Sequence, residues 1–181
     1  KTEKTGWDIG YANPALIEYA KTVLTPEHKI LIPGAGNAYE AEALYKLGFT
    51  KVYATDLSSE PKRNLSTRYP DFPESQYLVG DFFELNQTFD VILEQTFFCA
   101  LNPALRSNYV NQSHKLLNTH GLIAGVLFNF PLETGPPFGG SKEEYKQLFT
   151  KKFEILHLEN SRNSIEPRKK NEFFFQLKKI N

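Results

Sequence analysis

The stretch of residues 30–49, ILIPGAGNAYEAEALYKLGF, constrains the fold of this chain more than any other. Apolar residues are continuous over residues 30–32 and recur at helical spacing after the glycines Gly34 and Gly36. Gly48 then stands where the helix is expected to end. The pattern predicts a strand, a tight glycine turn and a helix, which is the repeating unit of parallel α/β folds.

The glycine turn and the acid that follows it point to a ligand. Asn37 and Glu40 form a candidate capping pair for the helix. The free N–H groups and the dipole of a helix N-terminus favour a carboxylate or a phosphate. Asp56 ends the next predicted strand, residues 51–55, and lies twenty residues after Gly36, where an acid can accept hydrogen bonds from ribose hydroxyls. The sequence therefore predicts an adenosine-type ligand at the edge of a parallel sheet.

Alternatives stay open for this turn. Two glycines between a strand and a helix also occur in α/β folds that bind nothing there. A dinucleotide site has a third glycine three positions after the second, and Tyr39 stands at that position here. S-adenosylmethionine carries a terminal carboxylate instead of a pyrophosphate, and it tolerates the shorter glycine pattern.

A second carboxylate follows another predicted strand. Residues 76–79 lead into Gly80, Asp81 and Phe82, which places a carboxylate beside aromatic rings. In open α/β sheets ligands lie at the carboxyl ends of the strands, so Asp81 can bond an adenine amino group while Phe82 covers the ring. An ordinary helix cap accounts for Asp81 equally well.

The rest of the chain completes an α/β sheet that finishes in a hairpin. Predicted helices cover residues 15–24, 58–69, 103–117 and 141–150, and further strands cover 91–93, 122–128, 153–158 and 172–177. The last two strands are joined by a basic loop without helical periodicity, which implies an antiparallel pair. We expect a mostly parallel seven-stranded sheet with helices on both faces and a C-terminal antiparallel hairpin.

Length and charge limit the number of domains and the class of partner. A chain of 181 residues is ample for one core and short for two, so we expect residues 1–181 to form a single domain with residues 1–24 as an N-terminal lid segment. Lys and Arg total 21 and Asp and Glu total 21, which leaves no net charge to support binding of nucleic acid or of an anionic membrane. We therefore expect a monomer whose partner is a small molecule.

Cysteine and histidine usage argues against a metal site. One cysteine excludes an intramolecular disulfide and a Cys-cluster metal site, and the four histidines show no ligand spacing. Cys99 lies in an apolar run, which favours a buried structural cysteine over a nucleophile. No apolar run is long enough to cross a bilayer, and a cytoplasmic location fits best. Because the chain opens with Lys1, we expect an upstream segment to precede it.

Four segments carry a family resemblance. They are GWDIGY at residues 6–11, GDFFEL at 80–85, ILEQTFFCAL at 92–101 and GPPFGG at 135–140. Together with the glycine turn and the final hairpin, they resemble class I S-adenosylmethionine-dependent methyltransferases, and more narrowly the thiopurine S-methyltransferase family with its plant thiol and halide methyltransferase branch. The resemblance implies a Rossmann-like fold, S-adenosylmethionine as the cofactor and a small-molecule methyl acceptor.

The resemblance also implies roles for residues that match the family's motifs. The implied cofactor site comprises Trp7, Gly34 and Gly36 under the methionine part, Asp56 at the ribose, Asp81 and Phe82 around the adenine, and Gln95 after the acid of the fourth-strand motif. Gln95 stands where the thiopurine branch has an arginine and plant members have a tyrosine, so hydrogen bonding is kept and the charge is lost. Trp7 is either a lid residue packed on the core or an aromatic wall over a cationic ligand.

The implied reaction is an in-line displacement in which a soft nucleophile takes the sulfonium methyl group. The expected acceptor is a thiol, a thiopurine or hydrosulfide. A thiol with a low pKa, hydrosulfide or a halide arrives already ionised, so no general base is assigned. Arg168 matches the family's arginine before the last strand and is the candidate catalytic residue that attracts the anion, although a basic cluster there is otherwise a solvated loop. The expected substrate pocket is dry and aromatic, and it is lined by Tyr11, Phe97, Phe98, Phe130 and Phe138.

Other functions stay in view. A halide, or another small molecule, is an alternative acceptor on the same scaffold. A nicotinamide-dependent oxidoreductase is opposed by Tyr39 and by the terminal hairpin. A non-catalytic cofactor-binding protein is opposed by the intact glycines and acids of the predicted site, although these residues report binding and not turnover.

Overall fold

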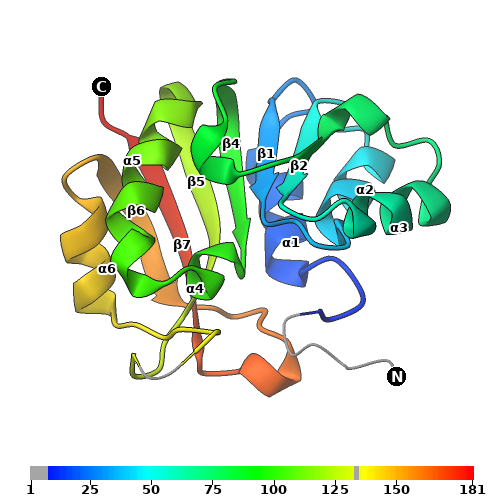
Figure 1. Cartoon of the computed structure of the whole chain (residues 1–181). Coiled ribbons are helices and arrows are strands. Elements are labelled where there is room, and N and C mark those ends of the chain that lie inside the picture. Colours follow the sequence, from blue (N-terminus) through cyan, green and yellow to red (C-terminus); the bar gives the residue numbers. More distant parts are fainter. Residues whose placement is uncertain (1–7, 133–134) are drawn as a thin grey trace.

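A computed structural model describes residues 8–132 and 135–181. One sheet runs through the molecule in the strand order β3-β2-β1-β4-β5-β7-β6 (Figure 1). The strands are β1 (Ile30–Pro33), β2 (Val52–Asp56), β3 (Tyr77–Val79), β4 (Phe89–Gln95), β5 (Leu117–Phe128), β6 (Phe153–Asn160) and β7 (Glu172–Lys179). The first five are parallel, whereas β7 runs antiparallel to both β5 and β6. The predicted fold class and terminal hairpin are confirmed.

Helices cover both faces of this sheet. They are α1 (Pro14–Val23), α2 (Tyr39–Lys46), α3 (Glu60–Arg68), α4 (Phe97–Ala100), α5 (Arg106–Leu116) and α6 (Lys142–Phe149), with 3-10 turns at η1 (Glu74–Gln76), η2 (Phe82–Glu84), η3 (Pro103–Leu105) and η4 (Glu166–Arg168). Ile30 and Ile32 belong to the buried cluster that includes residues of α1, α2 and α3. Leu31, between them, belongs to the opposite cluster with residues of α5 and α6. Because side chains alternate along a strand, a continuous apolar strand requires cover on both faces.

The first helix is capped by a residue that also reaches the sheet. Asn13 precedes Pro14, and its side-chain oxygen accepts a hydrogen bond from the Ala15 N–H at 2.9 Å. Proline at the first helical position fits because its missing N–H would have no partner within the helix. The Asn13 side-chain amide also donates to Gln95 Oε1 at the end of β4, so the same residue caps α1 and ties it to the sheet.

The predicted capping pair of α2 is wrong. The N-cap of α2 is Ala38, which has a left-handed backbone with φ of 54°. Asn37 lies one residue before this N-cap. The Asn37 side-chain amide donates to Asp8 Oδ2 at 2.7 Å. Glu40 is buried and accepts the backbone N–H of Asn13 at 2.9 Å. Glu40 therefore belongs to the interior and takes no part in a capping pair with Asn37.

Two element boundaries also differ from the sequence prediction. The apolar segment after β4, where no helix is predicted, forms the short helix α4. The helix predicted over residues 103–117 begins as η3 and ends at Leu116, where β5 starts directly with Leu117. Leu117 pairs with Phe89 of β4, so strand pairing extends β5 well before Gly121. In contrast, α6 begins as predicted, because the Ser141 hydroxyl accepts the Glu144 N–H.

Candidate active site

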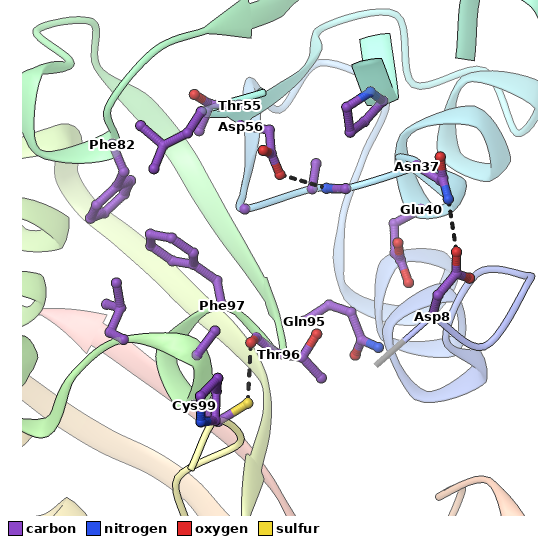
Figure 2. Close-up of a pocket in the computed structure, with 18 of the residues that line it drawn as sticks. Asp8, Asn37, Glu40, Thr55, Asp56, Phe82, Gln95, Thr96, Phe97 and Cys99 are labelled. Carbon is purple, nitrogen blue, oxygen red and sulfur yellow. Dashed lines mark hydrogen bonds between the residues drawn. The ribbon is translucent and has the colours of Figure 1, made fainter. Parts of the chain in front are cut away.

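A cavity of about 810 Å³ opens at the carboxyl ends of the parallel strands. Its wall comes from the loop between β1 and α2, the ends of β2, β3 and β4, helix α4, and the connection between β6 and β7 (Figure 2). The strand order reverses between β1 and β4, and in open α/β sheets ligands bind at such a switch point. We divide its lining into two sets, the glycine-loop half, with Gly34, Gly36, Asp56, Asp81 and Phe82, and the arginine half, with Cys99, Phe128, Pro136, Pro137 and Arg168.

The glycine loop is held against the end of β2. Gly34 and Gly36 have φ of 56° and 48°, a backbone region that side chains rarely adopt. A Cβ built on Gly34 would lie 2.3 Å from the Phe97 ring, so only glycine fits between the loop and that ring. The Gly36 N–H donates to Asp56 Oδ2 at 3.0 Å, and the Tyr77 hydroxyl donates to the Gly36 carbonyl at 2.8 Å. These bonds place the Asp56 carboxylate beside the loop, as Figure 2 shows.

Asp81 and Phe82 combine the two roles that the sequence left open. Asp81 Oδ1 accepts the Phe83 N–H at 2.9 Å, so Asp81 caps the turn η2. Both Asp81 and Phe82 also line the cavity. The Phe82 ring is buried, meets Phe97 edge to face at 5.2 Å, and stacks on Tyr109 at 5.6 Å. A cap and a cavity wall are therefore compatible at this position.

A polar edge joins the two halves. Asn13 donates through its side-chain amide to Gln95 Oε1 at 2.9 Å and through its backbone to Glu40 Oε1. Gln95 and Glu40 line the cavity. Burial raises the pKa of Glu40 above its ordinary value. The sequence reasoning missed Glu40 as a cavity residue, although an acid in the first turn after a glycine loop is a signal that could have identified it.

The acid at the end of β4 is buried. Glu94 has no exposed surface, and its Oε1 accepts the N–H groups of Phe97 and Phe98 at 2.7 and 2.9 Å. Its Oε2 accepts the Tyr109 hydroxyl at 3.0 Å. Burial raises the pKa of Glu94 to about 7. The sequence analysis gives Glu94 no role beyond its place as the acid of the fourth-strand motif, and its position inside an apolar strand was the available signal.

Arg168 lies inside the arginine half. It is buried, its guanidinium lies over the Phe128 ring at 5.6 Å, and its Nη1 is 3.4 Å from Glu172 Oε1. Burial raises the pKa of Glu172 above its ordinary value. The basic cluster of the sequence is thus split, because Arg168 faces the interior while Lys169 and Lys170 are exposed.

Cys99 is a thiol in the cavity wall. Its Sγ donates to the Thr96 carbonyl at 3.1 Å, and burial raises its pKa to about 12. A thiol with so high a pKa carries almost no thiolate at neutral pH and is a poor nucleophile. The prediction of a buried cysteine is confirmed.

Three aromatic residues expected in the substrate pocket lie outside the cavity wall that the described residues form. Phe98 points from α4 into the core, where its ring meets Tyr109 and Tyr145. Phe130 packs behind the wall, with its ring 4.9 Å from that of Phe128. Phe138 binds α4 through its backbone N–H, which donates to the Cys99 carbonyl.

Of the residues predicted for the substrate pocket, Tyr11 and Phe97 do line the cavity. Pro136 and Pro137, which the sequence did not single out, line it as well. Gly34, Gly36, Asp56, Asp81, Phe82, Gln95 and Arg168 line the same cavity, and Trp7 lies outside the described residues. The structure therefore brings most of the predicted site residues together in one cavity. It differs from the prediction in the aromatic part of the wall, from which Phe98, Phe130 and Phe138 are missing.

The family model described as thiopurine S-methyltransferase matches residues 1–179. The chain belongs to this family. It is 30% identical to the probable thiol methyltransferase 2 of Arabidopsis thaliana over 172 residues, which cover 91% of this chain and 76% of that relative. It is 26% identical to the thiocyanate methyltransferase 1 of Brassica oleracea over 186 residues, covering 98% and 81% of the two chains.

A solved structure agrees with the fold. The 1,6-didemethyltoxoflavin-N1-methyltransferase of Burkholderia thailandensis, with bound 1,6-didemethyltoxoflavin and S-adenosylhomocysteine, superposes with a TM-score of 0.75 at 18% identity. The match covers 93% of this chain and 77% of that chain. At this identity the likeness supports the fold, whereas the family match identifies the protein as an S-adenosylmethionine-dependent methyltransferase.

The charges of the cavity suit this cofactor. Among the described residues that line it, the acids are Asp8, Glu40, Asp56 and Asp81, and the basic residue is Arg168. An excess of carboxylates attracts a cofactor that carries a sulfonium and repels a pyrophosphate. This balance disfavours the dinucleotide alternative raised by the sequence.

Two other kinds of site are absent from residues 8–132 and 135–181. No group of three or more His, Cys, Asp or Glu side chains is arranged to hold a metal ion. No helix in this part of the chain is both long enough and apolar enough to span a bilayer.

Proposed function

We propose that this protein methylates the sulfur of a small anionic acceptor, such as a thiolate, a thiopurine or hydrosulfide, and that Arg168 attracts the anion. The observation that carries the proposal is that one cavity is lined both by Asp56, which lies beside the glycine loop, and by the buried Arg168. A buried guanidinium in an apolar wall favours an anion more strongly than an exposed one, because solvent screens it less.

The proposed cofactor site occupies the glycine-loop half. Gly34 and Gly36 both have positive φ, a conformation that residues with a side chain rarely adopt, and we assign the backbone of this turn to the methionine part. Each Asp56 oxygen already accepts one N–H, from Gly36 and from Ser58, and a carboxylate oxygen has a second lone pair for a ribose hydroxyl.

The adenine is assigned to the neighbouring strand end. Asp81 Oδ1 accepts the Phe83 N–H, and the other oxygen of this carboxylate can accept a hydrogen bond from an amino group. Phe82 supplies an apolar surface held by Tyr109. Gln95 lies at the border with the arginine half, where its amide can meet the methionine part. Trp7 keeps the cofactor role that the resemblance implies.

The chain's own contribution to the reaction is position and a dry surrounding. Bound S-adenosylmethionine supplies a sulfonium methyl group for displacement. Opposite charges disappear when an anion takes that group, so walls that exclude water lower the barrier. Phe97, Phe128 and Pro137 form such walls, and Arg168 holds the anion in their midst. A thiol that is already ionised in solution needs no base from the protein.

The test is formation of S-adenosylhomocysteine by the purified protein. The acceptor panel comprises hydrosulfide, small thiols, aromatic thiols, a thiopurine, iodide and phenols, each with S-adenosylmethionine. We expect turnover with the ionised sulfur acceptors and none with phenols. Turnover with iodide alone would identify a halide methyltransferase. Binding of S-adenosylhomocysteine without turnover of any acceptor would contradict the proposal.

We further propose that the protein acts as a cytoplasmic monomer without nucleic-acid or membrane partners. Support comes from the balance of 21 basic and 21 acidic residues and from the single cysteine. Sedimentation velocity at micromolar concentration is expected to give one species near 20.7 kDa for this chain.

A further inference from the structure

Helix α4 stands between the two halves of the cavity. Thr96, Phe97, Cys99 and Ala100 all line it, so this one turn contributes to both halves. Thr96 has a left-handed backbone with φ of 59° at the N-cap of the helix. A helix of four residues has too few internal hydrogen bonds to hold its own position. Its place must therefore be set by contacts from elsewhere.

One carboxylate supplies the main contact. Glu94 Oε1 accepts the N–H groups of both Phe97 and Phe98, at 2.7 and 2.9 Å, in place of a cap from Thr96. Glu94 is itself fixed on the central strand β4, where Gly125 of β5 gives it room. A Cβ on Gly125 would lie 2.6 Å from the Glu94 Cβ.

The second oxygen of Glu94 connects α4 to α5. It accepts the hydroxyl of Tyr109 at 3.0 Å. The Tyr109 ring lies 5.1 Å from Phe98 and 6.2 Å from Phe97, and it stacks on Phe82 at 5.6 Å. Tyr109 therefore braces both α4 and the turn η2, which carries a wall of the glycine-loop half.

A shift of α4 would disturb both halves at once. The Phe97 ring occupies the space that a Cβ on Gly34 would need, so it lies directly against the glycine loop. Two residues further along, Cys99 lines the cavity in the arginine half and accepts the backbone N–H of Phe138 through its carbonyl at 2.7 Å. The position of one short helix thus sets the spacing of the two halves.

Burial of an acid here is costly for stability. Desolvation raises the pKa of Glu94 to about 7, and the titratable groups that face it are Tyr109 of α5 and Cys99 of α4. Arg106 and Arg168 act on Cys99 from further away. An apolar residue of similar volume avoids this desolvation, so a buried acid is more readily explained by its hydrogen bonds than by stability.

We propose that Glu94 and Tyr109 are positioning residues for methyl transfer, which hold α4 at the distance from the glycine loop that aligns cofactor and acceptor. The proposal rests on the site assignment given under Proposed function. Neither residue needs to touch the reacting atoms. Their effect is transmitted through Phe97 and Cys99.

The test compares E94A, E94Q and Y109F with D90N as the matched control. Asp90 lies at the other end of the same strand and, like Glu94, accepts a backbone N–H and a side-chain donor. Each variant is first shown to be folded by circular dichroism, and then the dissociation constant of S-adenosylhomocysteine, kcat and both KM values are measured at a temperature where all are folded.

We expect E94A to lower kcat/KM about a hundredfold, as displacements near 1 Å do. E94Q keeps an oxygen for the two N–H groups and is expected to stay within a few-fold of wild type, whereas Y109F loses about tenfold. D90N is expected to match wild type. A merely structural role would lower the melting temperature and leave kcat and KM of the folded fraction unchanged.

Several outcomes overturn the proposal. Wild-type kcat and KM in folded E94A would do so, as would an E94Q loss equal to that of E94A or an equal loss in D90N. If E94A does not fold, wild-type kinetics in Y109F overturn it. The proposed function fails separately, when wild type turns over no acceptor, and the affinity for S-adenosylhomocysteine still ranks the variants in that case.

Discussion

The two halves of the cavity are built in different ways. The glycine-loop half comes from strand ends and the turns that directly follow them, and it is joined by hydrogen bonds from the backbone of the turn, such as Gly36 N–H to Asp56 Oδ2. The arginine half is assembled from segments far apart in sequence, namely α4, the end of β5, the segment at residues 136–137 and the turn η4. The first half depends on backbone geometry, whereas the second depends on packing.

The contacts that hold the arginine half make this difference concrete. Arg106 donates to the Gly139 carbonyl at 2.7 Å, and the buried Tyr145 hydroxyl donates to the Phe128 carbonyl at 2.7 Å. Both donors lie on helices behind the wall, α5 and α6. We therefore expect changes in the glycine-loop half to act sharply and locally, and changes in the arginine half to act mainly on the acceptor.

The largest expected effect is at Gly34. Substitution to alanine places a Cβ 2.3 Å from the Phe97 ring at a positive φ, so both strain and overlap oppose the native loop. We expect G34A to raise the dissociation constant of S-adenosylhomocysteine more than about a hundredfold, because a loop displaced by about 1 Å no longer holds the geometry of the bound state. Isothermal titration calorimetry measures this. In G36A, where the added Cβ has no described neighbour within 4 Å, only strain remains, and equal losses in both variants would refute the overlap argument.

The second effect concerns Glu94 and pH. Its pKa rises from 4.5 in the unfolded chain to about 7 in the folded protein, so folding retains a proton that the unfolded chain releases. The stability of wild type relative to E94Q is therefore greatest below pH 4.5, falls by about 3 kcal/mol in all between pH 4.5 and pH 7, mostly above pH 5, and levels off above pH 7. Urea unfolding of both proteins at pH 5 and pH 8 measures the difference. E84Q, which changes an exposed glutamate, is the control. A difference in unfolding free energy between wild type and E94Q that is the same at both pH values would contradict the prediction.

The third effect concerns Asp56. D56N keeps the shape and removes the charge that accepts the Gly36 and Ser58 N–H groups. We expect the affinity for S-adenosylhomocysteine to fall by about 2 kcal/mol, since hydrogen bonds to charged groups contribute on that order. KM for the acceptor should change little. D71N, on an exposed acid, serves as the comparison, and unchanged affinity in D56N would remove Asp56 from the proposed ribose site.

The smallest expected effect separates the two halves. R168K keeps a positive charge but loses the planar group that lies over Phe128 and near Glu172. We expect KM for an anionic thiol to rise about tenfold, as for the loss of one good polar contact, with cofactor affinity unchanged. R162K alters an exposed arginine of the same connection and controls for general effects. A loss of cofactor affinity in R168K alone would mean that the halves are not separable.

Local patterns in the sequence predicted the parts of this protein that depend on the backbone. The glycine turn, the change from continuous to helical spacing and the terminal pair of strands each report on a few neighbouring residues, and they led to the α/β sheet and its hairpin. The predicted positions of Gly34, Gly36 and Asp56 in one cavity follow from the same rule, since strand ends of a parallel sheet meet at one edge.

Which side chains of an apolar segment face the cavity was decided only by tertiary packing. Phe97 and Phe98 are adjacent and chemically identical, yet Phe97 lines the cavity while Phe98 joins Tyr109 and Tyr145 in the core. Their directions depend on the two N–H bonds to Glu94 that set the start of α4. Phe130 was predicted in the substrate pocket, and packing again decides its position. Its ring packs on that of Phe128, which itself lines the cavity.

The same limit explains the buried acids. Glu40 and Glu94 look like ordinary polar residues in the sequence, and their partners Asn13 and Tyr109 lie on other elements. Spacing along the chain reports hydrogen bonds only between close neighbours, whereas these bonds exist because the sheet brings distant elements together. The sequence by itself determined the sheet and the glycine-loop half, and tertiary structure determined the acceptor wall, because that wall is made of contacts between segments with no common local pattern.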